Sequence, residues 1–405
     1  SATVFLQQLG RGLRRSHDKD VLTVLDFVGH QTKSFRFDLR YRRMLGRTRR
    51  EIERDVDEDF PYLPAGCQVK LDPVAKKIVL DNIRTALPTR WPERVRELRE
   101  LGDVSLPAYL HETGLELDDV YQGGHTFTEM RRTAGILTSA ASAGEDRIGR
   151  GLGRLLHLDD LDRIETYRAL LGGQRPVFEQ DLDERHTRQL NGLLLTLLGP
   201  KKGEFNSLDE ATRHLWSHEA IRAELVELLP LLDVQVSHLH APLGLLQPVP
   251  LQIHATYTRE EVLAGFGAST VTAPLPLQTG VYWHESSQTD LFFITLQKTE
   301  KHYSPTTRYR DYAISDRLFH WESQSTTTSA SATGQRYINQ EANGTNVVFF
   351  VRSSRADVNG RTRPYFCAGR ARYIEHRSER PMQITWELHD RLPGDIFSAF
   401  RAAVA

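Results

Sequence analysis

The hydrophobic pattern of this 405-residue chain changes character near residue 250. Between about residues 70 and 250, Leu, Arg and Glu recur at helical spacing, which predicts an all-helical region. From 251 to 405, short aromatic and β-branched runs alternate with Gly, Pro and Ser, which predicts strands and turns. A chain of this length exceeds the size at which one hydrophobic core keeps growing, so more than one domain is expected.

The helical pattern is clearest where a capping residue precedes an apolar stripe. Asp72 followed by Pro73 predicts such a start. Helices are predicted at 73–83, 91–101, 105–113, 117–121, 161–171, 185–198 and 219–232. The glycine-rich stretch 149–154 lacks the lysine of a phosphate-binding loop and follows no β-run, so it predicts a polar turn before a helix. His238 and His240 have no third donor at a ligand spacing, and no metal site is expected.

The last region reads as a β-domain. Thr258 and Glu261 form a capping box before a short helix that ends near Gly267. A closing helix is predicted at 393–403, and strands are predicted at 280–284, 290–296, 346–352, 365–371 and 382–388. Several short strands at this spacing suggest a barrel or a sandwich.

The first fifteen residues contain the pattern Q-x-x-G-R-x-x-R, formed by Gln7, Gly10, Arg11 and Arg14. A guanidinium group stays charged and can grip phosphate oxygens through two parallel hydrogen bonds, so Arg11 and Arg14 are expected to act as arginine fingers. Residues 21–28 then form an apolar, β-branched run typical of a buried parallel strand. No G-x-x-x-x-G-K-[ST] loop accompanies this motif, so the chain alone is not expected to hydrolyse ATP.

The arginine motif resembles motif VI of superfamily 2 helicases, which lies near the end of their second RecA-like domain. This resemblance implies that the chain is the carboxyl-terminal part of something longer, whose missing helicase domains would bind ATP and Mg²⁺. The expected organisation is a helicase remnant at 1–55, a proline-rich connector at 56–69, a helical module at 70–250 and a β-domain at 251–405. No cofactor is expected in the chain itself.

Charge and cysteine content narrow the class of protein. Fifty-two Lys and Arg residues nearly cancel 53 Asp and Glu residues, so any binding to nucleic acid must come from local patches. Two cysteines are too few for a disulfide framework, as expected of a reduced cytoplasmic protein. Neither a signal peptide nor a membrane-spanning run is apparent. A soluble, intracellular protein is expected.

Segments 298–315 and 318–325 closely resemble the carboxyl-terminal domain of unknown function, of the DUF3427 type, that is appended to bacterial superfamily 2 helicases. Segment 60–67 also resembles the connector in those proteins. Some relatives add a phospholipase-D-type nuclease and act as ATP-dependent type IV restriction enzymes on DNA with modified cytosine. The resemblance implies an SRA- or PUA-like β-barrel that reads the modification. The expected fold class is therefore multidomain α+β: a RecA-like remnant, a helical module and this β-barrel.

A protein that inspects a modified base flips it out of the stack and holds it between rings, with polar groups on its Watson–Crick edge. Residues of both kinds gather in the β-domain, and alternation places Phe319 and Trp321 on one face of a strand with His320 on the other. Trp321 and Tyr282 are the favoured pocket residues. The full candidate pocket is Tyr282, Trp283, Asp290, Phe319, His320, Trp321, Glu322, Ser323, Gln324 and Tyr365. Plain core packing is the alternative for each ring.

A second set of side chains suits the phosphate backbone of double-stranded DNA, because lysines, arginines and hydroxyls make such contacts without reading sequence. The candidates are Lys298, Lys301, Thr306, Thr307, Arg308, Arg310, Thr326 and Thr327. No phospholipase-D-type H-x-K motif, nucleophile elbow or H-E-x-x-H pair appears, so catalysis by this chain is not expected. The competing interpretation is a protein-interaction scaffold that couples the helicase motor to a nuclease partner.

Overall fold

The computed structural model describes residues 49–58, 60, 71–85, 90–245, 249–297, 311–357 and 360–404. These residues divide into two compact units, the first comprising Ser1–Tyr121 with Phe127–Ala140, and the second Gln122–Thr126 with Ala141–Ala405. The predicted boundary at residue 250 therefore falls inside the second unit. The predicted helicase remnant lies almost entirely outside the described residues.

The first unit is helical in its described part. Tyr109 and Phe127 bring two of its helices together, with ring centroids 5.4 Å apart. Ser105 caps the first turn of α6 by accepting a hydrogen bond from Ala108 N, and Gly114 ends the same helix in the left-handed conformation. The helices are α3 (Arg49–Asp57), α4 (Pro73–Thr85), α5 (Trp91–Leu101), α6 (Leu106–Thr113), α7 (Leu117–Val120) and α8 (Phe127–Thr133).

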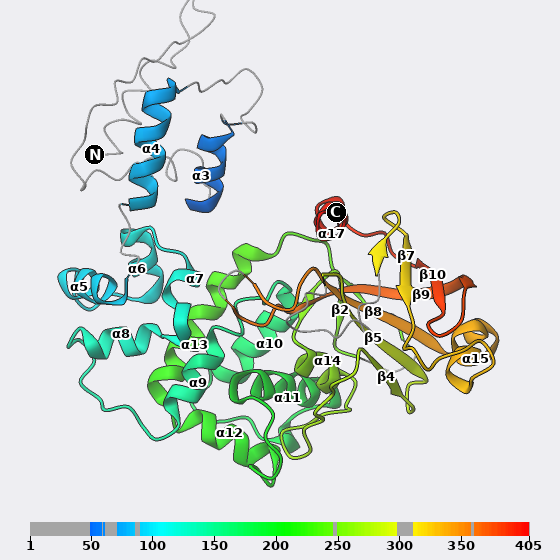
Figure 1. Ribbon diagram of the computed structural model, residues 1–405. Coiled ribbons are helices and arrows are strands. Elements are labelled where there is room, and N and C mark those ends of the chain that lie inside the picture. The colour runs from blue at the N-terminus through cyan, green and yellow to red at the C-terminus, as the bar shows by residue number, and fades with distance from the viewer. Residues whose placement is uncertain are drawn as a thin grey trace, which may run out of the picture. The chain divides into compact units, whose positions relative to one another are not determined.

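The second unit begins with a helical half built around one buried helix, α11 (Glu184–Leu198) (Figure 1). From Gln189 onward every residue of α11 is buried, because neighbouring helices surround it. Those neighbours include α9 (Glu145–Leu152), α10 (Leu161–Leu171) and α12 (Leu208–Trp216), and α13 (Glu219–Leu232) packs on these three helices. Short 3-10 turns lie at Gln122–Gly124, Glu179–Asp181 and Asp233–Gln235. All seven predicted helices between residues 70 and 250 are confirmed, whereas α8, α9 and α12 were not predicted.

Residues 149–152 form the end of α9, so the prediction that the stretch 149–154 is a turn before a helix was wrong for them; Gly153 and Arg154 form a turn after α9. A Cβ atom on Gly151 would lie 2.3 Å from the carbonyl oxygen of Leu197, which means that glycine permits the close approach of α9 to α11. The guanidinium of Arg154 donates to the carbonyls of Thr196 and Leu197, both at 2.7 Å. These bonds satisfy carbonyl groups that the end of α11 would leave unpaired. The stretch is a helix-packing element.

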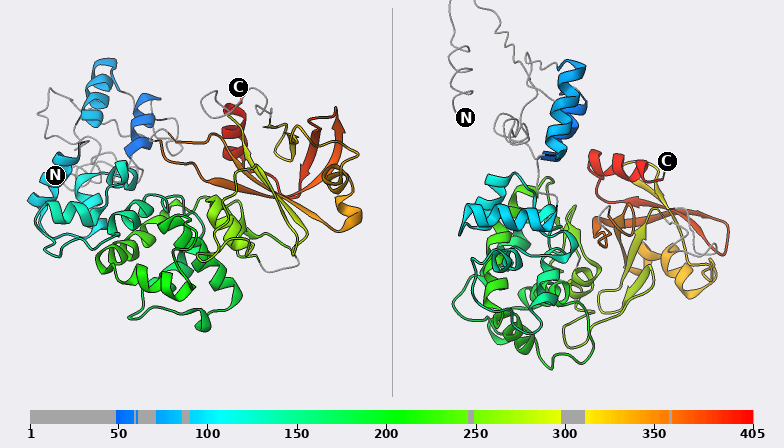
Figure 2. Two further views of the ribbon diagram at one scale, coloured as in Figure 1. Left: turned by 60° about the horizontal axis from the view of Figure 1, so that its bottom comes forward. Right: turned by 60° about the vertical axis from the view of Figure 1, so that its left-hand side comes forward.

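The second half of this unit is a sheet that packs directly against the helical half through a short helix. Helix α14 (Arg259–Gly265) lies between α11 and the sheet, and its predicted capping box of Thr258 and Glu261 is confirmed (Figures 1 and 2). The strands are β1 (Ala241–Pro242), β2 (Gln252–Ile253), β3 (Thr256–Tyr257), β4 (Val281–His284), β5 (Thr289–Thr295), β6 (Tyr312–Ala313), β7 (Leu318–Glu322), β8 (Asn346–Arg352), β9 (Tyr365–Arg377) and β10 (Gln383–Leu388). The remaining helices are α15 (Ala332–Ile338), α16 (Gln340–Asn343) and α17 (Gly394–Ala402).

The main sheet runs in the order β4-β5-β8-β9-β10-β7-β6, with β3 added on β9. The neighbouring strands β5 and β8 are parallel, and the other pairs are antiparallel. A separate two-stranded ladder joins β1 and β2. Strands β5 and β8 are buried on both faces, which explains their unbroken apolar sequences.

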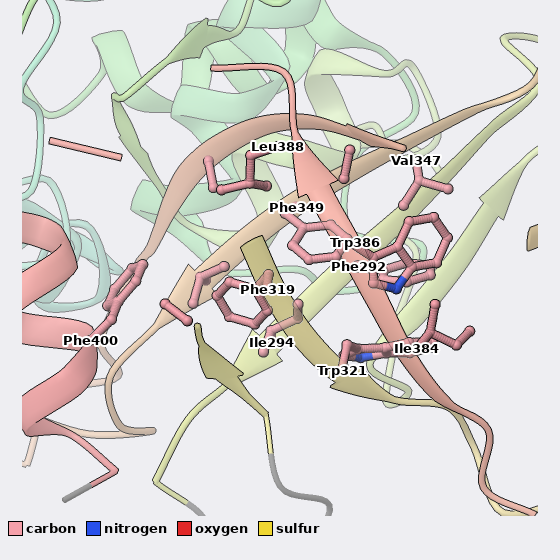
Figure 3. Packing of buried hydrophobic residues seen from close by; sticks show 14 of the residues in the cluster. Phe292, Ile294, Phe319, Trp321, Val347, Phe349, Ile384, Trp386, Leu388 and Phe400 are labelled. Atoms are coloured by element: carbon pink, nitrogen blue, oxygen red, sulfur yellow. The ribbon is translucent and has the colours of Figure 1, made fainter. Parts of the chain in front are cut away.

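The predicted closed barrel was wrong: in the described part of the chain the sheet is open, with β4 and β6 at its two ends. One face carries a core that includes Phe292 and Phe349 and also contains Tyr337 of α15 and Phe400 of α17. Figure 3 shows Phe292, Phe349 and Phe400 in this core. The other face carries Phe293 and its neighbours, covered by α14. A sheet packed by helices on both faces has no need to close on itself. The architecture is a helical half joined to a mixed, helix-covered sheet.

Candidate nucleic-acid interface

The two rings predicted to share a face of β7 do so, and they point into the core. Phe319 is fully buried and Trp321 is 5% exposed, whereas His320 faces the other way. The Trp321 ring lies 4.2 Å from that of Phe292 between centroids, and Figure 3 shows both within one aromatic cluster with Trp386. Phe319 packs edge-on against Phe349 at 5.4 Å. Their position favours core packing over stacking on a base.

Some of the polar residues beside Trp321 are exposed, whereas others are buried and bond to neighbouring strands. His320 stacks on Tyr312 of the edge strand β6, with ring centroids 4.7 Å apart. Burial lowers the pKa of His320, although the nearby carboxylates of Glu322 and Asp311 oppose this shift. Ser323 is fully buried, and its hydroxyl accepts from Met382 N at 2.9 Å, which ties two strands together. Gln324 and Thr326 are exposed and Thr327 is buried.

Asp290 is the most buried carboxylate of the predicted pocket, and both of its oxygens are bound to another side chain of the protein. Its two oxygens accept hydrogen bonds from the guanidinium of Arg336 at 2.7 and 2.8 Å. Burial raises the pKa of Asp290, with Arg336 acting in the opposite direction. The same guanidinium lies 4.2 Å over the ring of Trp283. Asp290, Arg336 and Trp283 therefore anchor α15 to the sheet, while Tyr282 packs against the core beneath α14.

Tyr365 lies at the centre of a group of arginines that sequence analysis did not select. The guanidinium of Arg352 stacks over the Tyr365 ring at 4.3 Å. Arg259 approaches from α14 and donates through Nη2 to the Tyr365 hydroxyl at 2.8 Å. The Arg352 Nη1 also donates to the carbonyl of Arg363 at 3.0 Å, which holds the segment after β8 against this centre.

That segment is rich in arginine and contains a single carboxylate, Asp357, between residues 353 and 364. Asp357 pairs with Arg361 at 3.3 Å. Arg355 is exposed, and its side chain has no hydrogen-bond or ion-pair partner within the described ranges. The Nε atoms of Arg259 and Arg363 are buried without a hydrogen-bond acceptor. We call Arg259, Arg352, Arg355, Arg361 and Arg363 the arginine cluster.

The arginine cluster lies where the parallel strands β5 and β8 end. Leu296 N donates to Arg352 O at 3.0 Å, and Gln297 N donates to Ser353 O at 2.8 Å, so the two strands leave the sheet at one edge. Parallel strands commonly present binding groups at their carboxyl ends. Gln297 also directly precedes the segment predicted to contact the DNA backbone. The members of that segment, Lys298, Lys301, Thr306, Thr307, Arg308 and Arg310, lie outside the described residues, as do Gln7, Gly10, Arg11 and Arg14.

A signal for the arginine cluster was present in the sequence. Four arginines fall within the twelve residues from Arg352 to Arg363, opposed by one aspartate. What the sequence did not reveal was that Arg259, some hundred residues earlier, would join them on Tyr365.

In the described parts of the chain no group of three or more His, Cys, Asp or Glu side chains is placed to hold a metal ion. Among the described helices, none combines the length and apolarity needed to cross a membrane.

Comparison with known families finds a match for the residues that form the main sheet. Residues 251–400 match the family described as domain of unknown function (DUF3427). These residues form a DUF3427 domain. The domain contains α14, the whole of the main sheet and every member of the arginine cluster. No curated protein matches the chain.

Proposed function

We propose that this chain binds double-stranded DNA through the arginine cluster of its DUF3427 domain. One observation carries the proposal: Arg259, Arg352 and the segment to Arg363 gather at one sheet edge around Tyr365. Guanidinium groups bind phosphate oxygens through paired hydrogen bonds, and each neutralised phosphate releases counterions. The near-zero net charge of the chain is compatible with DNA binding, because the arginines attract phosphate groups only in their own neighbourhood.

Members of the cluster have different expected roles. Arg259 and Arg352 are held by Tyr365, Thr295 and backbone carbonyls, so they shape the edge and contribute fixed positive charge. Arg355 is exposed and its side chain has no hydrogen-bond or ion-pair partner within the described ranges, which suits direct contact with a phosphate. The segment from Lys298 to Arg310, which was predicted to contact the DNA backbone, follows Gln297 in the sequence and lies outside the described residues.

The finer proposal is that the DUF3427 domain senses a modified base in an ATP-dependent superfamily 2 helicase or restriction enzyme. It is supported by the resemblance of segments 298–315 and 318–325 and by the arginine motif at the start of the chain. In that protein Arg11 and Arg14 would complete the ATP site of missing domains. Because Phe319 and Trp321 are core residues, base reading is not assigned to them.

Fluorescence anisotropy with two duplexes of one sequence, unmodified and carrying 5-methylcytosine, tests the proposal. We expect both to bind, the modified one more tightly. Arg355→Gln should weaken both alike, whereas Arg213→Gln, which removes an exposed arginine from α12, should change neither. Binding of neither duplex would refute DNA binding, and equal binding of both would refute modification sensing alone.

A second candidate function is supported by one exposed apolar segment. Val234 is 86% exposed and Leu239 is 94% exposed on the stretch that joins α13 to β1. Large apolar side chains this exposed favour a protein contact. A scaffold that recruits a nuclease partner would lose that partner on Val234→Ser and Leu239→Ser, with DNA binding unchanged. Loss of DNA binding in the same double variant would instead assign the segment to the first function.

A further inference from the structure

The chain passes from the first unit into the second for the last time between Ala140 and Ala141, and it is fastened directly after that point. Ser142 is exposed, and its hydroxyl lies 2.6 Å from Nδ1 of His218. His218 is only 3% exposed and directly precedes α13, 76 residues further along the chain. The ring of His218 therefore anchors the segment that arrives from the first unit.

Glu145, the first residue of α9, completes this anchor. Its Oε2 atom accepts from Ser142 N at 3.2 Å and lies 3.3 Å from the Ser142 hydroxyl. Glu145 N in turn donates to the carbonyl of Ser142 at 3.1 Å, so these two residues hold each other. A chain in which His218 Nδ1 donates to the Ser142 hydroxyl, and that hydroxyl donates to Glu145, uses one proton at each step. We call His218, Ser142 and Glu145 the histidine latch.

The second ring nitrogen of His218 determines when the histidine latch is stable. Nε2 is buried and has no hydrogen-bond partner in the part of the chain that the structure describes. A neutral ring can leave Nε2 without a proton, whereas a charged ring would bury both an N–H donor and a positive charge. Burial and then the neighbouring His214 lower the pKa of His218, with Glu145 acting in the opposite direction. The closed latch therefore favours a neutral ring.

The helices packed around His218 compensate poorly for a charge on it. His214 of α12 stands edge-on to the His218 ring, with centroids 4.9 Å apart, and a charge on His214 would repel a second cation. Glu145 of α9 is the carboxylate that attracts one. From α13, Arg222 N donates to the His218 carbonyl at 3.0 Å, but the Arg222 guanidinium lies over the Trp216 ring at 4.1 Å.

We propose that the histidine latch is an acid-sensitive device: when the His218 ring takes up a proton it leaves its buried position, and the segment that follows Ala140 is released. The open state binds this proton more readily than the closed state does. The latch is therefore fully closed above the ordinary histidine pKa of 6.5 and opens as the pH falls below that value. Release lengthens the free connection between the two units. The device lies in the helical half and does not depend on DNA binding.

Hydrogen–deuterium exchange between about pH 7.5 and 5 tests the latch, with rates corrected for the intrinsic pH dependence of amide exchange. The amides of Ser142 and Glu145 are both hydrogen-bonded in the closed state. In wild-type protein the peptide that contains them should lose protection by up to about tenfold for each pH unit below 6.5. The buried part of α11 should stay protected over the same range.

His218→Asn keeps a donor near the position of Nδ1 but cannot be charged, so the acid-induced loss of protection should disappear. The matched control is His214→Asn on α12, which should retain that loss because the His218 ring still titrates. If His218→Asn does not fold, Ser142→Ala replaces it, since Ser142 is exposed. That variant cuts the link to the ring, so protection of Glu145 should be low at every pH.

Three results would overturn the proposal. One is unchanged protection of the Ser142 and Glu145 peptide in wild-type protein across the pH range. Another is the wild-type acid response in folded His218→Asn, or in Ser142→Ala where that variant is used. The last is an equal acid loss in α11, because it would show that the second unit unfolds as a whole rather than opening at the histidine latch.

Discussion

Glu261 Oε1 lies 3.0 Å from Nη1 of Arg163, and these two buried side chains are 98 residues apart in the sequence. The other carboxylate oxygen of Glu261 lies 2.7 Å from Nε2 of His157. Arg163 also donates to the carbonyl of Thr256 at 2.7 Å. Arg163 belongs to α10 of the helical half and Glu261 to α14 of the DUF3427 domain. The pair therefore fastens the two halves of the second unit to one another.

Replacing Glu261 by Gln should destabilise the second unit strongly. The change keeps the size of the side chain but, among the described residues, leaves Asp160 and Asp159 as the remaining ion-pair partners of the buried Arg163. Removing one member of a buried ion pair typically costs about 3–5 kcal/mol of unfolding free energy. Urea titration followed by circular dichroism measures it. As a control, Glu184→Gln removes an exposed partner of Arg188 and should change stability by less than about 1 kcal/mol.

Stability should also fall on acidification because of this carboxylate. Burial alone would raise the pKa of Glu261, but the charges of Arg163 and His157 and hydrogen bonds from His157 and Thr258 lower it from 4.5 to about 2. The folded state then binds its proton less tightly than the unfolded state does. The resulting stability is complete above pH 4.5 and is lost as the pH falls toward 2. Thermal melts across that range should show a smaller acid loss for Glu261→Gln than for wild type; equal losses would contradict this account.

Trp321→Ala distinguishes a core ring from a base-stacking ring. Trp321 packs on Phe292 and Tyr337, so its truncation should cost about 3–5 kcal/mol of unfolding free energy. The control is Tyr312→Ala on β6, whose ring is 38% exposed and whose loss should cost much less. Thermal or urea unfolding separates the two outcomes. A well-folded Trp321→Ala protein of unchanged stability would show that the ring is not structural.

Gly151→Ala should destabilise the helical half. The added Cβ would lie 2.3 Å from the carbonyl oxygen of Leu197, so α9 and α11 must separate, at a cost of about 1–3 kcal/mol. Gly394→Ala is the matched control, because nothing lies within 4 Å of its added Cβ at the start of α17. Chemical denaturation of both variants measures the difference. Equal stability of the two would show that Gly151 is not needed for close helix packing.

Local signals in the sequence predicted local structure well. The capping box of Thr258 and Glu261, the apolar runs of β5 and β8 and the alternation through β7 all depend on neighbouring residues, and all are confirmed. The parallel pairing of β5 with β8 joins segments more than fifty residues apart, so no local pattern contains it. The barrel prediction failed because the described sheet stays open between β4 and β6, and no local pattern shows whether the ends of a sheet pair with each other.

The candidate site likewise depends partly on local patterns, which the sequence shows, and partly on long-range contacts, which it does not. Aromatic residues of β7 could be assigned to one face from alternation, but only the tertiary packing of Phe292 and Trp386 shows that this face is the core. Arg259 and Arg352 come together because both contact Tyr365. These three residues belong to segments that are separate in the sequence. Glu261 was predicted as a cap, and its second role as partner of Arg163 became apparent only from the fold.

The salt dependence of duplex binding tests the central claim most directly. For wild-type protein, log Kobs should fall linearly with log salt concentration, with a slope of about −0.9 for each phosphate neutralised. The double variant Arg355→Gln, Arg363→Gln should show a slope shallower by roughly 1–2, with weaker binding to every sequence. A wild-type affinity that does not change with salt, or a double variant with an unaltered slope, would contradict DNA binding through the arginine cluster.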